Sequence, residues 1–209
     1  MRSASDLVAD PWIRLGMGAA ATVITALPAR QPAVGRCEAR AFLAVNSLPD
    51  LLYRPVWAIM QLGTLGAAPA AAGAALLARD RQLASRLLAA GVCTWAFSKP
   101  IKKLVRRPRP ATLVSGARLR GREASGLGYL SGHAGVAAAL GAAAASRLSP
   151  AGRAVIAAAV PIVGLSRMYV GAHLPLDIAG GAALGIAVEA AIVLAGDDPG
   201  RIIKVWPAR

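Results

Sequence analysis

The only two histidines of the chain, His133 and His173, stand in contexts suited to phosphoryl transfer. Asp177 follows His173 by four residues, about one helical turn, and can therefore accept a hydrogen bond from the ring Nδ1–H. That bond would fix the tautomer and leave Nε2 free as a nucleophile. His133 then remains as the general acid for the leaving oxygen. This set predicts a site that transfers a phosphoryl group.

Fixed cations and the N-terminus of one helix could bind the phosphoryl group. Arg109 and Arg167 can each bind phosphate oxygens through two parallel hydrogen bonds, and Lys102 adds a point charge. Ser131 is well placed as an N-cap residue, so the free amide of Gly132 would point at an anion. Because these cations can replace Mg²⁺ in balancing phosphate charge, we expect the site to use no metal ion and no other cofactor.

The composition places these residues in a membrane protein. Hydrophobic residues make up 56% of the 209-residue chain and charged residues 16%, and the mean hydropathy is +0.53. Soluble domains carry about 25% charged residues. A net charge of +14 on so apolar a chain indicates anionic lipid headgroups or phosphate substrates. No nucleic-acid-binding motif accompanies the charge, so we expect no nucleic-acid partner.

Six apolar segments lie between charged residues, and each predicts a membrane-spanning helix. Period-two alternation, which would indicate strands, is absent. The sequence therefore predicts an all-α, polytopic membrane protein with a six-helix bundle. The third segment could extend to Leu104 and the fifth could begin at Pro150. The segments are Leu15–Leu27, Leu51–Leu77, Leu83–Phe97, Ser131–Ala145, Ala154–Leu165 and Pro175–Ala195.

The first 49 residues carry two features of their own. The first apolar segment could be a signal peptide, but Pro28 occupies the region of the cleavage site, so we expect an uncleaved helix. Val34–Asn46 mixes charged residues with Phe42 and Leu43, which predicts an amphipathic helix lying on the membrane. We expect a single domain over residues 1–209, with the motif-bearing core at about 50–196.

The order of the helices brings the candidate residues to one side of the membrane. Lys102, Arg109 and the segment 131–133 lie around the third-to-fourth connection, and the segment 166–177 spans the fifth-to-sixth connection. These two connections are separated by an even number of spans, so both reach the same side. Once the cations assigned to chemistry are set aside, the basic residues number eleven on this side and ten on the other. Their balance therefore does not select a membrane face.

Two features inside the helices predict contacts between them. Gly135, Gly181 and Gly185 would let helix backbones approach closely, as they do where lipid supplies no hydrophobic drive. Glu189 is an acid within the sixth segment, about three turns beyond Asp177. We expect it to pair with a neighbouring helix rather than to join the site.

The candidate residues fall into three motifs in a fixed order. Residues 102–110 fit Lys-x6-Arg-Pro, residues 130–133 fit Pro-Ser-Gly-His with Leu130 in place of the proline, and residues 166–177 fit Ser-Arg-x5-His-x3-Asp. This pattern resembles the type 2 phosphatidic acid phosphatase (PAP2) superfamily, which covers lipid phosphatases, acid phosphatases and vanadium haloperoxidases. The departure at Leu130 removes no catalytic group and bears on the rate and on the rigidity of the loop.

The resemblance implies a PAP2-type bundle of six transmembrane helices and a role for each candidate residue. His173 would form a phosphohistidine, Asp177 would orient it, and His133 would protonate the leaving group. It also implies a multi-pass protein of the cell membrane with its active site on the extracytoplasmic face. The phosphoryl group would be held by Lys102, Arg109, Ser131, Gly132 and Arg167.

We therefore expect an integral membrane lipid phosphatase that hydrolyses a phosphomonoester or diphosphate on a polyprenyl or glycerolipid carrier. The motifs contact the phosphate and not the lipid tail, so the sequence leaves the substrate and the oligomeric state open. A vanadate-dependent haloperoxidase-like enzyme is one alternative, although the apolar chain argues against it. The other is a catalytically silent lipid-phosphate binding or transport protein, against which the intact His133, His173 and Asp177 argue.

Overall fold

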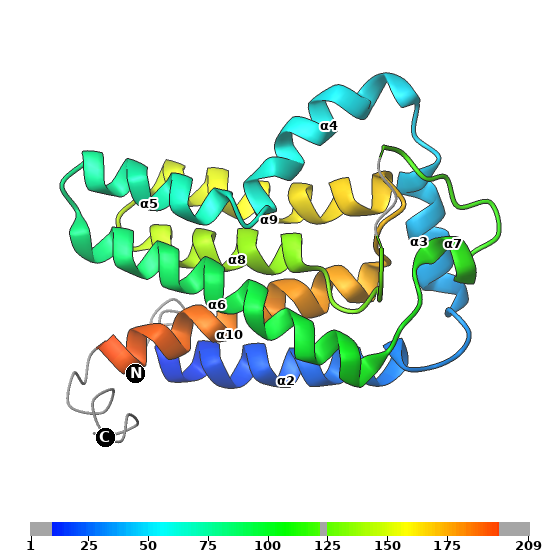
Figure 1. The fold of residues 1–209 in the computed structure, drawn as a ribbon, viewed down its shortest axis with the longest axis horizontal. Coiled ribbons are helices and arrows are strands. Elements are labelled where there is room, and N and C mark those ends of the chain that lie inside the picture. The colour runs from blue at the N-terminus through cyan, green and yellow to red at the C-terminus, as the bar shows by residue number, and fades with distance from the viewer. Residues whose placement is uncertain (1–9, 122–124, 197–209) are drawn as a thin grey trace.

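The chain folds into a bundle of helices, seen in a computed structural model that describes residues 10–121 and 125–196 (Figure 1). These residues form no strand. Short 3₁₀-helices, η1 (Asp50–Leu52) and η2 (Gln61–Gly63), flank α4. The α-helices are α2 (Pro11–Ala29), α3 (Arg36–Asn46), α4 (Tyr53–Met60), α5 (Ala67–Leu77), α6 (Arg81–Val105), α7 (Pro110–Leu113), α8 (Gly132–Ala145), α9 (Pro150–Tyr169) and α10 (Pro175–Gly196).

Four of the long helices begin at a side chain that caps them. An Asp or Ser occupies the N-cap position and accepts a hydrogen bond from a backbone amide of the first turn. Such caps satisfy amides that have no acceptor within the helix. Proline occupies the first turn of α2 and α9, where its missing N–H costs nothing. The caps are Asp10, Asp80, Ser131 and Ser149.

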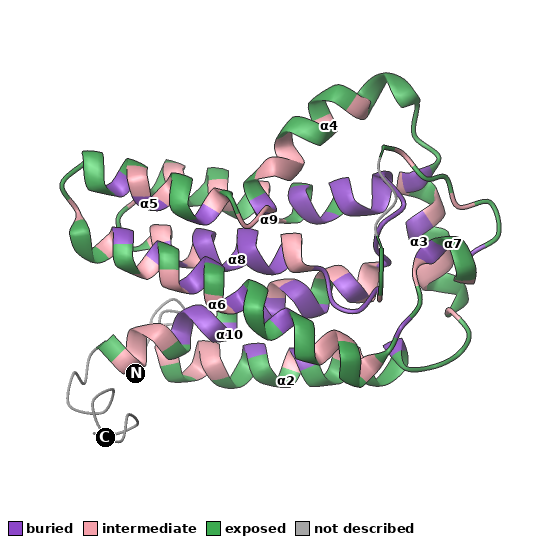
Figure 2. Ribbon diagram, viewed as in Figure 1, coloured by how far each residue is buried: buried purple, intermediate pink, exposed green. Residues whose placement is uncertain are grey.

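Helix α8 is the most enclosed helix of the bundle, and α10 packs closely against it (Figure 2). A side chain on Gly185 would collide with the backbone carbonyl of Gly135, and one on Gly181 would collide with that of Ser131. On the other side of α10, a Cβ on Gly18 of α2 would lie 2.7 Å from the Ala183 carbonyl oxygen. The prediction that small residues permit close helix contact is therefore confirmed.

The outer surface of the bundle carries large apolar side chains, as expected where lipid covers it. On α2, Trp12, Met17 and Ile24 are each more than 60% exposed. Among the described residues, α2, α9 and α10 are long and apolar enough to cross a membrane. Helix α6 carries basic residues toward both ends and α8 has only 14 residues, so their membrane crossing, and the count of six spans, stays a prediction.

The predicted single span Leu51–Leu77 is wrong in its geometry. The segments Asp50–Gly63 and Ala67–Leu77 are bent by 70° and form at most one broken span. The Thr64 hydroxyl donates to the Gln61 carbonyl at 2.8 Å, a local bond that competes with helix formation. Gly63 packs against the start of α8, where a Cβ would lie 2.5 Å from the His133 carbonyl oxygen. The break therefore lets the chain approach α8.

Helix α3 forms where the amphipathic segment was predicted, but its apolar face lies on protein. Phe42 is fully buried and packs with Val114, Met168 and Leu174. Asn46 is also buried, and its side-chain amide donates to the carbonyls of Arg118, Met168 and Tyr169 at 2.9–3.1 Å. The expectation that this face lies on the membrane is thus wrong for Phe42. Helix α3 instead closes the end of the bundle that carries the candidate residues.

The interior acid Glu189 pairs with two neighbouring helices, as predicted. Its carboxylate is fully buried and binds Arg14 of α2 and Arg86 of α6. Arg86 Nε donates to Oε1 at 2.8 Å. These contacts lie toward the end of the bundle opposite to α3 and α7 (Figure 1).

Candidate active site

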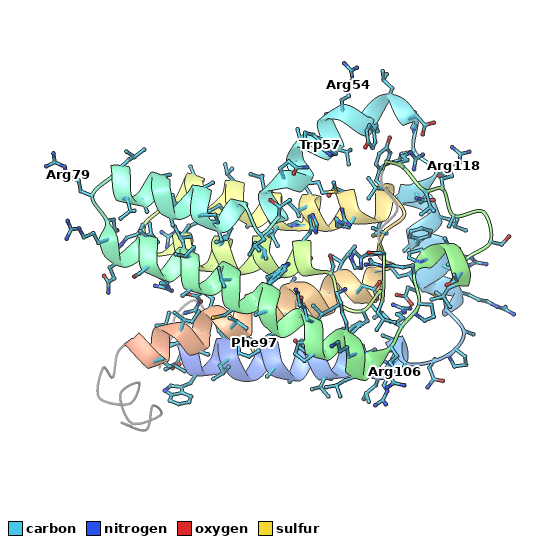
Figure 3. The ribbon with its side chains drawn as sticks, viewed as in Figure 1. Arg54, Trp57, Arg79, Phe97, Arg106 and Arg118 are labelled. Carbon is cyan, nitrogen blue, oxygen red and sulfur yellow. The ribbon has the colours of Figure 1, made fainter. Side chains whose placement is uncertain are left out.

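The three motifs meet at the end of the bundle where α3 and α7 lie (Figure 1). Arg106 and Arg118 mark this end in Figure 3, and Arg79 marks the opposite end. Each candidate residue lies in the last turn of a helix, in a connecting loop, or in the first turn of the next helix. The first motif follows α6, the second begins α8, and the third runs from the end of α9 into α10.

His173 lies buried directly before α10, in contact with Arg109. Its Nε2 is 3.0 Å from Arg109 Nη1, which also donates to the Ala172 carbonyl at 2.7 Å. Burial lowers the pKa of His173 well below its usual value, and the positive charges of Lys102, Arg109 and Arg167 lower it further. The imidazole is therefore neutral near pH 7, and its Nε2 lone pair can act as a nucleophile once Arg109 turns toward a phosphate.

Asp177 lies beside His173, but the contact is longer than a good hydrogen bond. Its Oδ2 is 3.5 Å from His173 Nδ1 and 2.9 Å from the Leu174 amide, which donates to it. Its Oδ1 accepts a hydrogen bond of 2.8 Å from Arg107 Nη1. The predicted proximity of the pair is present. The short partners of Asp177, however, are Arg107 and the backbone rather than the imidazole.

Two residues that sequence reasoning did not assign to the site, Arg107 and Glu38, hold Asp177. Arg107 binds Glu38 through two parallel hydrogen bonds, Nη1 to Oε1 at 2.9 Å and Nη2 to Oε2 at 2.6 Å. Glu38 Oε1 also accepts from the Leu176 amide at 3.0 Å. Burial opposes the charge of Arg107, yet its bonds to Glu38 and Asp177 prevail and raise its pKa. Arg107 thus stays a cation between two carboxylates.

No local pattern could have joined Glu38 to the site. It lies in α3, far along the chain from all three motifs, and reads as a polar residue of an amphipathic helix. Arg107 was visible in the sequence as one of several basic residues of the first motif. The usable signal was indirect, because a buried acid such as Asp177 needs a cation beyond those that hold phosphate.

Lys102, in the last turn of α6, holds the loop that precedes α8. Its ammonium donates to the carbonyls of Leu127 and Gly128 at 3.2 Å and to that of Leu130 at 2.6 Å. Leu130, the residue in the proline position of the second motif, is fully buried. Lys102 therefore lies at the site and, in this state, orders the loop that leads to Ser131.

Ser131 occupies the N-cap position of α8, as predicted. Its hydroxyl accepts from the Ala134 amide at 3.4 Å, and its own amide donates to the Asp177 carbonyl at 2.8 Å. The second and third motifs are thus joined through the backbone. The amides of Gly132 and His133 lie in the first turn, where α-helical geometry offers them no acceptor within the helix.

Arg167 lies in the last turn of α9 and is a buried cation with an unpaired hydrogen-bond donor. Its Nη1 lies 2.7 Å from the sulfur of Met60, and its Nε is buried without a partner. Its backbone carbonyl accepts from the amides of Ala172 and His173 at 2.9 and 3.2 Å, which fixes the loop before α10. A guanidinium so enclosed lacks an anion.

The charges of the site leave room for an anion. Lys102, Arg109, Arg167 and Arg107 contribute four positive charges, and Asp177 and Glu38 contribute two negative charges, which leaves +2 before either histidine takes up a proton. Within residues 10–121 and 125–196, no group of three or more His, Cys, Asp or Glu side chains could hold a metal ion. A doubly charged phosphate would balance the site.

Two solved structures resemble this fold. The crystal structure of Aquifex aeolicus LpxE has a TM-score of 0.68 and 21% identity, covering 77% of this chain and 96% of its own. The crystal structure of a transmembrane PAP2 type phosphatidylglycerolphosphate phosphatase from Bacillus subtilis has a TM-score of 0.69 and 20% identity, covering 92% and 99%. At this identity the likeness concerns the fold.

Sequence comparisons gave one match. A comparison with curated proteins gave none. The family model described as the PAP2 superfamily matches residues 82–200, more than half of the chain and a range that contains all three motifs. Together with the helical membrane fold, this match establishes that the chain belongs to the PAP2 superfamily.

Proposed function

We propose that this protein is a membrane phosphatase that removes a phosphate group from a lipid phosphomonoester or diphosphate. The observation that carries the proposal is the arrangement of Lys102, Arg109 and Arg167 around His173, a neutral and buried imidazole. Uncompensated cations favour binding of a phosphate, and a neutral imidazole can attack it. The membrane fold makes a lipid the accessible substrate.

The proposed reaction has two steps. His133 is protonated beside the bound phosphate, whose negative charge offsets the nearby cations. His173 Nε2 attacks phosphorus while the bond from phosphorus to the leaving oxygen breaks, and the protonated His133 gives that oxygen its proton. Water then attacks the phosphohistidine, and His133 accepts a proton from it. Inorganic phosphate leaves, and both histidines return to their starting state. Throughout, Asp177 and the Arg107 behind it keep the imidazole in place.

A glycerolipid phosphomonoester is the substrate class to test first. The Bacillus subtilis relative is named a phosphatidylglycerolphosphate phosphatase, and this chain covers 99% of its length. A polyprenyl diphosphate is the second class, since the site residues contact only the phosphate. We further propose that the site lies on the extracytoplasmic face of the cell membrane.

The test is phosphate release by the purified protein in neutral detergent with EDTA present. The panel holds phosphatidylglycerol phosphate, phosphatidate and a polyprenyl diphosphate, each with a matched His173→Ala sample. We expect release from at least one lipid by the unaltered protein and none by His173→Ala. Lipid binding without release would support the silent binding protein instead. Activity that disappears with EDTA and returns with Mg²⁺ would contradict the metal-free site.

A further inference from the structure

A cavity of about 640 Å³ lies at the end of the bundle opposite to the candidate active site. Residues of α2, α6, α8, α9 and α10 line it, and the lining between the helices is small and apolar, as at Ala21, Ala142 and Ala183. A second hollow of about 170 Å³ shares Arg86 and Ser146 with it. The volume falls within the usual range of about 300–1,000 Å³ for ligand sites.

The described lining of this cavity has more arginines than carboxylates to pair with them. Arg14, Arg86 and Arg153 line it, and the first two share the single buried carboxylate of Glu189. Among the described residues at this cavity, three positive charges and one negative charge leave +2. Arg153 is exposed and has no partner within the described part of the chain, and Arg14 Nε is buried without one. The pair with Glu189 thus joins α2, α6 and α10 but leaves charge unbalanced.

The positive charge and the apolar lining together indicate which chemical class of ligand fits this cavity. A small soluble anion would bind the arginines and leave the apolar walls in contact with nothing. A purely apolar molecule would fill the walls and leave the positive charge unbalanced. A molecule with a phosphate at one end and a hydrocarbon chain at the other satisfies both, and the surrounding bilayer supplies it.

We propose that this cavity binds an anionic glycerophospholipid. Its phosphate would contact Arg153 and the free donors of Arg86, and one acyl chain would lie along α8 between α2 and α9. This lipid is distinct from a substrate. On α6, Arg86 and Lys102 are sixteen residues apart, which separates the two charge clusters by about 24 Å along the helix.

The test compares two lipids with identical acyl chains on delipidated protein in neutral detergent. Phosphatidylglycerol and phosphatidylcholine are titrated while native mass spectrometry and the melting temperature are recorded. Saturating inorganic phosphate is present to occupy the candidate active site. We expect one tightly held phosphatidylglycerol and a higher melting temperature, with no such response to phosphatidylcholine. The shift is measured against protein in the same saturating phosphate, so that binding at the candidate active site is already included. A further increase in phosphate should not reproduce the shift, and if it does, the proposal of a lipid fails.

Three variants locate the binding. Arg153→Gln removes an exposed and unpaired charge, so the fold should persist while phosphatidylglycerol binds about tenfold more weakly. Ala145→Leu fills the apolar lining and should also weaken binding. Arg81→Gln, an exposed arginine at the same end that lines neither cavity, is the matched control and should bind as the unaltered protein does. Equal affinity in Arg153→Gln, or equal weakening in Arg81→Gln, would overturn the proposal.

Discussion

Two buried clusters of arginine and carboxylate lie at opposite ends of this bundle, and they differ in which charge is in excess. At the candidate active site, one arginine, Arg107, binds two carboxylates, Glu38 and Asp177. At the other end, two arginines, Arg14 and Arg86, bind one carboxylate, Glu189. In the first cluster, Arg107 binds both carboxylates through Nη1 and Nη2, while its Nε is buried without a partner, and the candidate phosphate-binding cations lie outside this cluster. The second holds three helices together and keeps a positive charge.

The difference shows how a membrane protein can use one kind of ion pair for two purposes. A cluster with excess acid fixes the candidate carboxylate Asp177, because the two terminal nitrogens of its arginine bind carboxylates from two helices. A cluster with excess base attracts an anion, because a buried cation without a partner is costly. Changes at the first cluster should therefore alter catalysis, whereas changes at the second should alter stability and lipid binding.

The largest effect should come from the proposed nucleophile, His173. His173→Ala should abolish turnover of every substrate, while Glu189→Gln at the other end should leave kcat of the folded protein within about twofold. The control is equal folding of the two purified variants by size-exclusion chromatography. A surviving rate in His173→Ala, or a large loss of kcat in folded Glu189→Gln, would remove the division between the two ends.

Replacement of the proposed general acid, His133, should cause a loss of rate that depends on the leaving group. His133→Ala should slow hydrolysis of a lipid phosphate by about 10²–10⁴-fold, because an alkoxide leaves poorly without a proton. A nitrophenyl phosphate should be spared, since its leaving group is stable as an anion. The measurement is the rate against the pKa of the leaving group. The same loss for every leaving group would reassign His133.

The next largest effect should come from replacing the residues that hold Asp177 in place, Arg107 and Glu38. Arg107→Gln leaves the buried Asp177 and the partly buried Glu38 without their cation, so we expect a loss of stability of about 3–5 kcal/mol and about 10²-fold lower kcat. Glu38→Gln keeps a hydrogen-bond acceptor and should cost less in both. Unfolding in denaturant and kcat at fixed substrate report the two effects. If Arg107→Gln behaves like Glu38→Gln, the two-carboxylate arrangement does not hold the nucleophile.

The charge state of His173 can be read directly, because the chain has only two histidines. In His133→Ala the remaining imidazole signal should titrate well below pH 6.5, since burial and nearby cations lower the pKa of His173. The unfolded chain then binds more protons than the folded one, so this residue's contribution to stability falls as pH drops below about 6.5. A titration midpoint at or above 6.5 would contradict the enclosed, cation-lined site.

The smallest perturbation tests which side of the membrane each cluster faces. Cys37 lies exposed on α3 at the active-site end, one residue before Glu38. If the site is extracytoplasmic, a membrane-impermeant maleimide should label Cys37 in intact cells, and Cys37→Ser should remain unlabelled. Labelling only after the cells are opened would place the active site on the cytoplasmic face and the lipid cavity outside.

Much of the candidate site was readable from the sequence because its spacings are local. Four residues separate His173 from Asp177, and Ser131 precedes an apolar helix as its cap. Alternation of apolar segments and charged connections then placed the motifs at one end. Helical periodicity and the length of a membrane span determine these features, and both are properties of neighbouring residues.

The tertiary structure decided what depends on long-range partners. Only packing could show that Glu38 reaches Arg107, that Arg109 contacts His173, and that Phe42 faces protein rather than lipid. The bend between α4 and α5 likewise follows from the close approach of Gly63 to α8. A buried charge requires some opposite charge, and the sequence states that requirement. Which of many arginines meets it is settled by where the helices bring their ends together.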